Sequence, residues 1–372
     1  MMTNKRGLID ELKIDSRILD DKKEQTTKKI EYVRAYVKGW LYVMTGKPGI
    51  KTITFIDAMC NAGIYRDGDL ASACEVCLFF RDFAKQHPHL TFNLYINDAK
   101  QKRVDACAAI CNYLIDGNCS NVNLLYASSD VNKFLYEAAR TDEVPRGLHD
   151  AVLLFVDPYN AHTVHLGALK AFINSCYCEV LFNWFSSDPV RNKESKAIAD
   201  CLDGLEISED MDAGKTIGDE LRVGSMKYVF RYTFCTRTNT ELYQIIFVTP
   251  HEKGLEKLKQ ALWDTFHGAP YHRNKNASLA RQATLFDEDT IEKTYADQWG
   301  TEAQQRLLVA FSSRSGVTYE EIKVYVLEQT MLREGQIIRE LLKPLINKGL
   351  ITKDGNVIKR NFKEDTYSFP CR

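Results

Sequence analysis

The 372-residue chain lacks an excess of charge of either sign, and it lacks any long apolar run free of charged side chains. Its formal net charge is −1, so no overall basic field would attract nucleic acid, and such a partner would have to bind a local patch. No stretch approaches the length of a bilayer-spanning helix. No apolar segment follows the basic residues near the start, so we expect a cytoplasmic protein without a leader and without membrane contact.

The eleven cysteines lack the arrangement of a disulfide framework or of a complete zinc site. Their number is odd, and in a reducing compartment free thiols mostly act as small buried apolar groups. A structural zinc normally needs two cysteine pairs at similar spacing, so we assign no metal ligands from the sequence. Three close groups nevertheless invite a metal interpretation: Cys74-x-x-Cys77, Cys107-x-x-x-Cys111 and Cys176-x-Cys178.

Apolar, strand-like runs alternate with helical ones through the first half of the chain. The charged residues at 1–23 lack periodicity and are expected to form a loosely held arm, followed by an amphipathic helix at 24–44. Further helices are predicted at 73–86, at 100–115 and from Val131. Continuous apolar strands separated by helices are typical of a parallel sheet covered on both faces, that is, of an α/β fold. The strands are predicted at 52–57, 92–98, 122–126, 151–157 and 179–184.

The end of the predicted sheet breaks this alternation. The strands at 227–235 and 242–248 are joined by only a few polar residues, which permits only an antiparallel hairpin. Five parallel strands closed by a hairpin follow the order of class I methyltransferases, whereas a nicotinamide-binding Rossmann sheet would end with another parallel crossover. We therefore expect a Rossmann-like methyltransferase-type domain over 24–285. The polar stretch 188–225 is expected to be an insertion that acts as a lid or a partner surface.

The last part of the chain has a different pattern. A helix at 253–266 and a linker at 268–297 are expected to precede helices at 302–311, from Thr318 and at 332–348. Thr318 with Glu321 forms a capping box, and Gly349 ends the third helix. Residues 353–356 then predict a hairpin turn between strands at 350–352 and 357–359. Three helices followed by a hairpin indicate a winged-helix domain at 298–372.

The first strand ends in a turn of small residues where a cofactor could approach the backbone. Asn, which stands at position 61, is the non-glycine residue that best tolerates a left-handed conformation. The glycine pattern G-x-G-x-x-G is absent, however. Taken alone, these residues are explained about equally well by an ordinary strand-to-helix turn and by a cofactor site. The turn residues predicted to bind a cofactor are Asp57, Ala58, Cys60, Asn61 and Gly63.

Two further acids follow the second and third predicted strands. Asp98 ends the second strand, where an acid can accept hydrogen bonds from both ribose hydroxyls of a nucleoside. Asp130 follows the third strand, near the expected adenine edge. Each can instead cap the helix that begins after it, and Asp98 can do both.

The fourth strand leads into Asp157-Pro158-Tyr159-Asn160, which we predict to be the catalytic segment. A carboxylate at the carboxyl edge of the sheet can accept a hydrogen bond from an amine, while the neighbouring ring stacks on a planar base. A buried Asp that caps a turn before proline is the alternative explanation.

These motifs resemble those of the three-Cys-motif partner protein family, TcmP. The family has a strand of the form F-I-D-x-F-A-G-P-G and a later D-P-[FY]-G, which itself resembles motif IV of exocyclic-amine methyltransferases. The resemblance implies S-adenosylmethionine as cofactor, with Asp57 and Gly63 at its methionine end, Asp98 at its ribose end and Asp157 with Tyr159 at the methyl-transfer end. The matching segments are 28–40, 55–63, 157–160, 249–255 and 261–263.

The chain departs from the family at several of these positions. Asn61 and Asn160 replace glycines, Cys60 replaces an alanine, and Ala62 replaces a proline. Two hypotheses follow: a methyltransferase of an exocyclic amine on a nucleic-acid base, or an inactive adaptor that binds a genetically linked partner protein or nucleic acid.

Basic residues gather in the predicted winged helix. They form a candidate phosphate-facing surface for DNA or RNA, although Glu334, Glu340 and Asp354 dilute its charge. Winged helices also mediate protein contacts, so both kinds of partner are expected candidates. The predicted nucleic-acid-binding residues are Arg333, Arg339, Lys343, Lys353, Lys359 and Arg360.

Overall fold

The computed structural model describes residues 7–371 except 116, 118, 143, 148, 186–194, 209–210, 236–240, 273–287 and 355–360. The chain forms two compact units, a first unit at Met1–His251 and a second unit at Glu252–Arg372. This division comes earlier in the chain than the domain boundary expected after residue 285. In the part of the chain that the structure describes, no helix is both long and apolar enough to cross a membrane.

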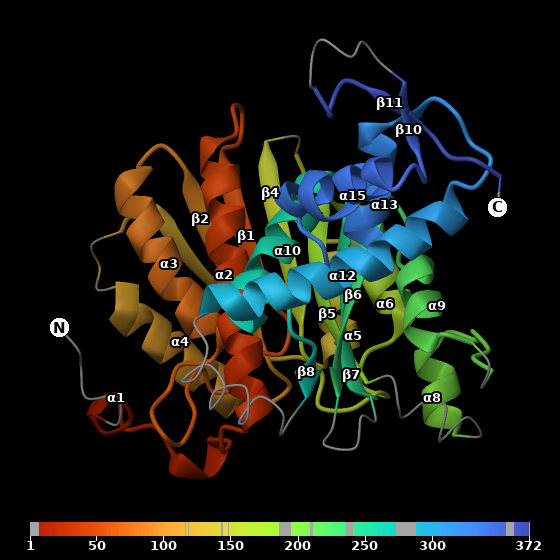
Figure 1. Cartoon of the computed structure of the whole chain (residues 1–372). Helices are drawn as coiled ribbons and strands as arrows, with labels where there is room; N and C mark the ends of the chain where they lie inside the picture. The colour runs from red at the N-terminus through yellow and green to blue at the C-terminus, as the bar shows by residue number, and fades with distance from the viewer. Residues whose placement is uncertain are drawn as a thin grey trace. The chain divides into compact units, whose positions relative to one another are not determined.

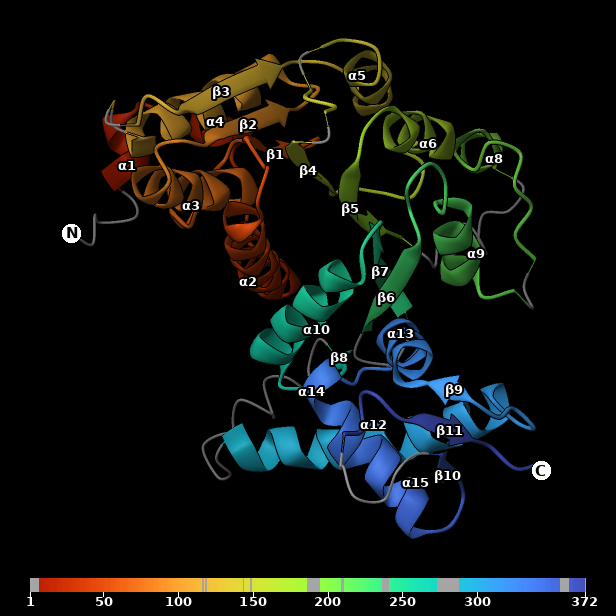
Figure 2. The ribbon, with the colours of Figure 1, turned by 90° about the horizontal axis from the view of Figure 1, so that it is seen from above.

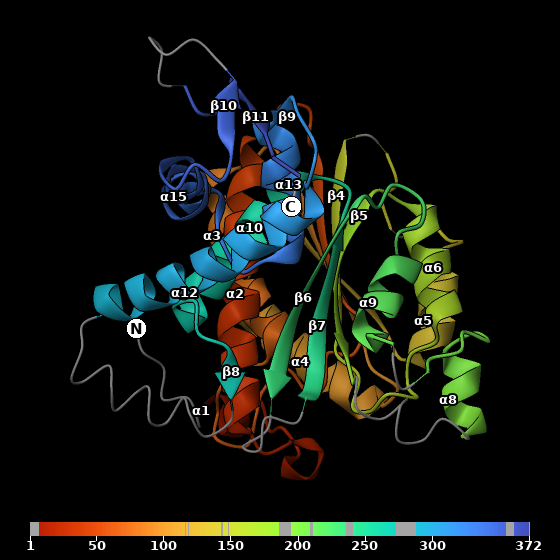
Figure 3. The same ribbon diagram turned by 45° about the vertical axis from the view of Figure 1, so that its right-hand side comes forward.

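Seven strands of the first unit (Figure 1) form one sheet in the order β3-β2-β1-β4-β5-β7-β6 (Figure 2). The first five run parallel, as predicted. β7 runs antiparallel to both β5 and β6, which confirms the closing hairpin (Figure 3). The strands are β1 (Thr52–Asp57), β2 (Thr91–Asn97), β3 (Val122–Ala127), β4 (Asp150–Val156), β5 (Cys178–Trp184), β6 (Tyr228–Cys235) and β7 (Glu241–Thr249).

Helices cover both faces of this sheet, as the alternation of elements predicted (Figure 2). On one face lie α2 (Glu24–Gly46), α3 (Ser72–Gln86) and α4 (Gln101–Ile115). On the other face lie α5 (Val131–Ala138), α6 (Leu166–Ser175) and α9 (Ala213–Glu220). The alternating side chains of each central strand thus meet a helix on either side, which is why nearly every position of β1, β2, β4 and β5 is buried.

The stretch 188–225 is not simply a surface insertion, and the expectation of a lid is corrected in part. It contains α8 (Lys196–Cys201) and α9, and Ile217 and Leu221 are fully buried against the sheet. Their core cluster also includes Leu154 and Val248 of β4 and β7. β6 runs parallel to β5, and β7 lies between them in the sheet. The chain must therefore cross one face of the sheet between β5 and β6, and α8 and α9 lie in this crossover.

The second unit contains a helical core and a small antiparallel sheet of order β10-β11-β9. The capping box of Thr318 and Glu321 is present at the start of α13, and a π-helical segment joins α14 to α15. The elements are α10 (Glu252–Phe266), β8 (Tyr271–His272), α12 (Glu288–Ala310), β9 (Val317–Thr318), α13 (Tyr319–Gln329), α14 (Glu334–Gln336), the π segment (Ile337–Leu342), α15 (Lys343–Asn347), β10 (Thr352–Asp354) and β11 (Thr366–Ser368).

Two predictions for this unit were wrong. The expected linker at 268–297 contains the first turns of α12, because the polar side chains of that stretch suit an exposed helix as well as a loop. The hairpin was placed too early, because Lys353 and Asp354 belong to a strand and not to its turn. β10 pairs with β11 at 366–368, and the predicted partner strand at 357–359 lies outside the described residues.

Candidate functional site

The turns that follow β1, β2 and β4 meet at the carboxyl edge of the first unit's sheet. Asp57 ends β1, and its two neighbouring strands place Asp98 and Asp157 on either side of it. Backbone hydrogen bonds join the three turns: the Ala58 amide donates to the Phe155 carbonyl oxygen at 3.0 Å. The Cys60 amide donates to the Asn97 carbonyl oxygen at 2.7 Å. The adjacency expected of parallel strand ends is therefore present.

Asn97, which the sequence analysis did not single out, ties this edge together. Its side-chain amide nitrogen donates to the carbonyl oxygens of Ala58 and Ser129, at 3.0 and 3.1 Å. Its amide oxygen accepts from the Ser129 backbone nitrogen at 3.1 Å. A polar residue at the end of an otherwise apolar strand was the available signal, because a buried amide needs such partners.

The β1 turn has the backbone conformation that its residues suggested. Asn61 has a φ of 57°, and its side-chain oxygen accepts from the Ala62 amide at 2.6 Å. Gly63 has a φ of 76°. A Cβ added at Gly63 would lie 2.6 Å from the Cys74 sulfur and 2.9 Å from the Cys107 sulfur, so the missing side chain makes room for α3 and α4. Close helix packing is thus the role that the geometry gives this glycine.

Asp57 is fully buried, and its carboxyl group organises the turn. One oxygen accepts from the Met59 amide at 3.2 Å and the other from the Ser72 hydroxyl at 2.6 Å. Burial raises the pKa of Asp57 to about 7, although these two hydrogen bonds oppose the rise. The charges of Asp157 and Asp98 raise the pKa further, so the three carboxyl groups lie within electrostatic range.

The raised pKa predicts how an Asp57→Asn variant depends on pH. A buried carboxyl whose pKa rises from 3.8 to about 7 on folding stabilises the fold only while it is protonated, and that contribution is lost as the pH rises through this window. The unfolding free energy of wild type should fall relative to that of the variant by about 2–3 kcal/mol as the pH rises from about 5 to about 8. Urea unfolding of both proteins at each pH measures it. Parallel pH profiles would contradict the assignment.

Asp98 and Asp130 have different surroundings. Asp98 is buried, and its Oδ1 accepts from the Lys100 amide at 2.9 Å, while its Oδ2 lies 4.0 Å from Nη1 of Arg103. Asp130 is exposed and caps α5, accepting from the amides of Asn132 and Lys133 at 2.9 and 3.3 Å. The capping alternative therefore holds for Asp130, whereas Asp98 accepts within the turn before α4, which begins at Gln101, and lies beside Arg103.

Asp157 is held from two sides at the end of β4. Its Oδ2 pairs with the Lys29 ammonium of α2, and its Oδ1 accepts from the Asn183 amide of β5 at 2.7 Å. Its side chain is 25% exposed, and Pro158 after it is buried. The carboxylate thus already accepts from a nitrogen donor at the position where an amine substrate was expected. Neither Lys29 nor Asn183 was predicted, because both come from elements distant in sequence.

The next two residues point to different partners. Tyr159 is 53% exposed, and its hydroxyl accepts from Nη1 of Arg103 at 2.5 Å while the guanidinium carbon lies 5.6 Å from its ring centroid. Asn160 turns back on its own loop and accepts from the His162 amide and the Thr163 hydroxyl at 3.2 and 2.7 Å. The structure therefore brings Tyr159 to the site and assigns Asn160 to the turn.

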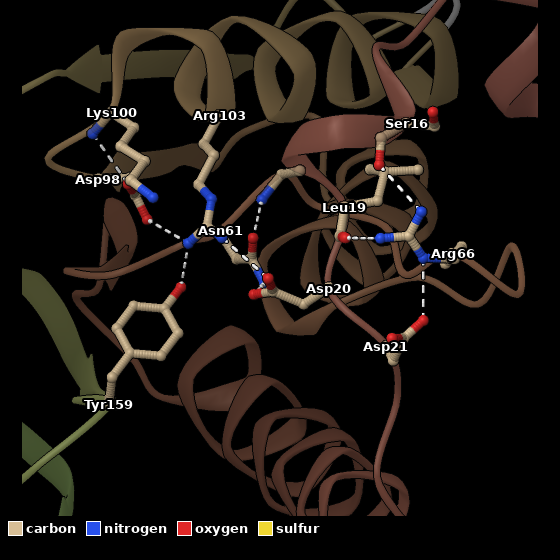
Figure 4. Close-up of polar contacts among 11 residues, drawn as sticks. Ser16, Leu19, Asp20, Asp21, Asn61, Arg66, Asp98, Lys100, Arg103 and Tyr159 are labelled. Carbon is tan, nitrogen blue, oxygen red and sulfur yellow. Dashed lines mark hydrogen bonds and ion pairs between the residues drawn. The ribbon is translucent and has the colours of Figure 1, made fainter.

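The lack of periodicity had suggested that the arm before α2 is loosely held, but side-chain contacts fix its residues 16–20 to the first unit. Asp20 accepts from the Asn61 side chain at 2.8 Å and from Nη2 of Arg103 at 2.9 Å (Figure 4). Arg66 donates to the carbonyl oxygens of Ser16 and Leu19 at 3.2 and 2.8 Å. Arg103 thus joins the arm, Asp98 and Tyr159 in one polar network at the sheet edge (Figure 4).

The basic residues of the second unit are mostly engaged within it. Arg333 lies over the Trp263 ring, 4.6 Å from its centroid, and pairs with Glu292 at 3.1 Å; Arg339 pairs with Glu340. Lys343 and Lys353 come together over the ring of Phe362, at 5.9 and 5.2 Å from its centroid. Lys353 also pairs with Asp365. Lys359 and Arg360 lie outside the described residues.

Comparisons with known proteins give low-scoring matches among solved structures. No family model matches the sequence, and no curated protein matches it. Among solved structures, one match is the methyltransferase subunit of a type I restriction-modification system from Streptococcus thermophilus (11% identity, 57% of this chain and 43% of that chain, TM-score 0.32). Another is a SAM-dependent methyltransferase from Aquifex aeolicus (12%, 57% and 88%, 0.28). A third is a 16S rRNA (adenine(1408)-N(1))-methyltransferase from Catenulisporales acidiphilia (12%, 57% and 90%, 0.29).

The chain thus spans less than half of the length of the first of these structures. What the site does must be argued from its own residues.

Proposed function

We propose that this protein is an S-adenosylmethionine-dependent methyltransferase that acts on an exocyclic amine of a nucleic-acid base. The observation that carries the proposal is the meeting of three carboxyl groups at one sheet edge, those of Asp57, Asp98 and Asp157. A sulfonium carries a positive charge, and nearby carboxylates stabilise a cation at such an edge. Ligands of open α/β sheets bind outside the carboxyl ends of the strands.

The residues present fit the adenosyl group through Asp98 at its ribose end and through the β1 turn at its methionine end. Asp98 uses Oδ1 to accept from the Lys100 amide and leaves Oδ2 available to accept from ribose hydroxyls. Asp57 has no such role, because both of its oxygens are engaged by Met59 and Ser72. It would shape the turn of Ala58, Cys60 and Asn61 around the methionine end. Asp130 would act only through α5.

Asp157 would hold the substrate amine. When bound, the cofactor supplies an activated methyl group on a sulfonium, so positioning of the amine lowers most of the barrier. Asp157 accepts hydrogen bonds from two nitrogen donors in the structure, Lys29 and Asn183. In the reaction the amine would replace Lys29 at Oδ2, while Asn183 keeps the carboxylate oriented through Oδ1. The half-exposed Tyr159 ring would stack on the base.

The second unit would present the substrate. Its helices α12, α13 and α15 and its three-stranded antiparallel sheet support the interpretation as a winged helix. Lys343 and Lys353 around Phe362 would contact phosphates of DNA or RNA. The motifs at 55–63 and 157–160 support kinship with the three-Cys-motif partner proteins, and a partner protein encoded nearby is part of this proposal.

A second candidate function is that of an inactive adaptor with the same fold. The network of Asp20, Asn61 and Arg103 favours it, because the arm engages the very turn that would receive the cofactor. Asn160, which faces its own loop instead of the site, favours it too.

Calorimetric titration of the full chain with S-adenosylmethionine and with S-adenosylhomocysteine tests the proposal. We expect saturable binding of both at one site per chain, followed by transfer of labelled methyl groups to a pool of unmodified DNA and RNA. An Asp98→Asn variant should bind both ligands more weakly, because an amide has only one oxygen that can accept from the ribose hydroxyls and carries no charge. No binding by folded protein would exclude the enzyme and support the adaptor. Binding without transfer to either nucleic acid would exclude the proposed substrate class.

A further inference from the structure

Four buried thiols from two neighbouring helices meet beside the β1 turn. Cys74 and Cys77 lie on α3, and Cys107 and Cys111 lie on α4. The Cys74 sulfur lies 3.8 Å from that of Cys107 and 3.7 Å from that of Cys111. All three sulfurs are within 4.8 Å of one another. The packing of α3 on α4 thus unites two cysteine pairs that the sequence shows as separate halves.

We propose that this thiol cluster, Cys74, Cys107 and Cys111, binds a thiophilic d10 metal ion, Zn²⁺ or Cu⁺. Thiolates bound to zinc at about 2.3 Å in a tetrahedron lie about 3.8 Å apart, which is close to the two shortest sulfur separations here. Thiolate ligands select these ions over harder ones such as Mg²⁺ and Ca²⁺. The sequence argument against zinc was the lack of a second pair, and the helix packing supplies that pair.

A fourth ligand is available from the same surroundings. The Cys60 thiol of the β1 turn interacts with that of Cys107, and the Cys77 thiol donates to the Cys111 carbonyl oxygen at 3.5 Å. Either sulfur would be the fourth ligand of a tetrahedral set. Gly63 leaves the space next to the cluster free of a side chain, since an added Cβ would contact two of the three sulfurs.

Binding requires the thiols to lose their protons. A free cysteine is a thiol at neutral pH, so each sulfur that becomes a ligand releases one proton to solvent as its lone pair forms the metal bond. No oxidant or reductant takes part. The bound ion would fix the β1 turn, through Cys60 and Gly63, against α3 and α4.

The experiment uses the full chain, reduced under anaerobic conditions and treated with a chelator. Zn²⁺ and Cu⁺ are added separately, and native mass spectrometry counts the ions that remain after gel filtration. We expect about one ion of either Zn²⁺ or Cu⁺ to be retained per chain. Co²⁺ in place of Zn²⁺ should give intense thiolate-to-metal absorption. The ion that is retained distinguishes the two metals.

Cys107→Ala and Cys111→Ala should reduce retention to a small fraction of wild type, because each removes a ligand from the cluster. The matched controls are Cys176→Ala and Cys178→Ala, two buried cysteines of the same unit outside the cluster, and they should retain the ion fully. Equal retention by all four variants, or none by wild type, would overturn the proposal. If the cluster variants do not fold, proton release on adding the ion to wild-type protein decides: two or more protons per ion are expected, and none would refute thiolate binding.

Discussion

Asp157→Ala should lower the rate constant of methyl transfer by about 100- to 1,000-fold, the range that removal of one preorganised polar contact to a reacting group produces. Binding of S-adenosylmethionine should change little, because the expected cofactor contacts are at Asp98 and at the β1 turn. Single-turnover transfer of labelled methyl groups gives the rate, and calorimetry gives the affinity. A variant that keeps its rate would show that Asp157 is a structural cap before Pro158.

The design of this experiment must account for Lys29, whose ammonium would lose its partner. Lys29 is only 15% exposed, so the single variant leaves a poorly solvated charge. A Lys29→Met, Asp157→Ala double variant removes both charges and should be as inactive as the single variant while regaining stability. Asn160→Ala is the matched control, because Asn160 bonds only within its own turn and its loss should spare the rate. Recovery of activity in the double variant would mean that the unpaired lysine, and not the lost carboxylate, caused the defect.

The parts of the site that could be predicted are those that one strand end determines by itself. Asp57, Asp98 and Asp157 each close an apolar strand, and parallel strands bring their carboxyl ends to one edge. Lys29 and Asn183 could not be inferred, since their contacts depend on how α2 and β5 pack beside β4. Arg103 is hidden for a similar reason: it lies on the exposed-looking, charged start of a helix, yet only 10% of its side chain is exposed.

Composition was a weaker guide than periodicity. The stretch 188–225 looked like a surface insertion because its charged residues outnumber its apolar ones, yet a few well-spaced apolar side chains, such as Ile217 and Leu221, bury one face of α9. The arm misled in the opposite way, since its contacts are polar and leave no apolar pattern. Polar docking of this kind needs the partner surface, here Arg66 and Arg103, before it can be recognised.

Gly63→Ala is expected to destabilise the first unit by about 2–5 kcal/mol. A left-handed conformation costs a residue with a Cβ about 1–2 kcal/mol, and Gly63 has a φ of 76°. The new methyl group would also lie 2.6 Å from the Cys74 sulfur, and overpacking of this kind adds about 1–3 kcal/mol. Urea unfolding monitored by circular dichroism measures the loss.

Gly117→Ala separates these two causes. Gly117 also has a left-handed φ, 60°, but a Cβ added there meets no atom within 4 Å, so its variant should lose only the conformational part, about 1–2 kcal/mol. A Gly63→Ala, Cys74→Ala double variant removes the closest sulfur and should recover part of the packing loss. Recovery stays partial, because the Cys107 sulfur and Cα remain 2.9 and 3.0 Å from the new methyl group. Two results would contradict the packing of the turn against α3 and α4. One is an equal loss of unfolding free energy in Gly63→Ala and Gly117→Ala. The other is a loss in the double variant that equals the sum of the losses in its two single variants.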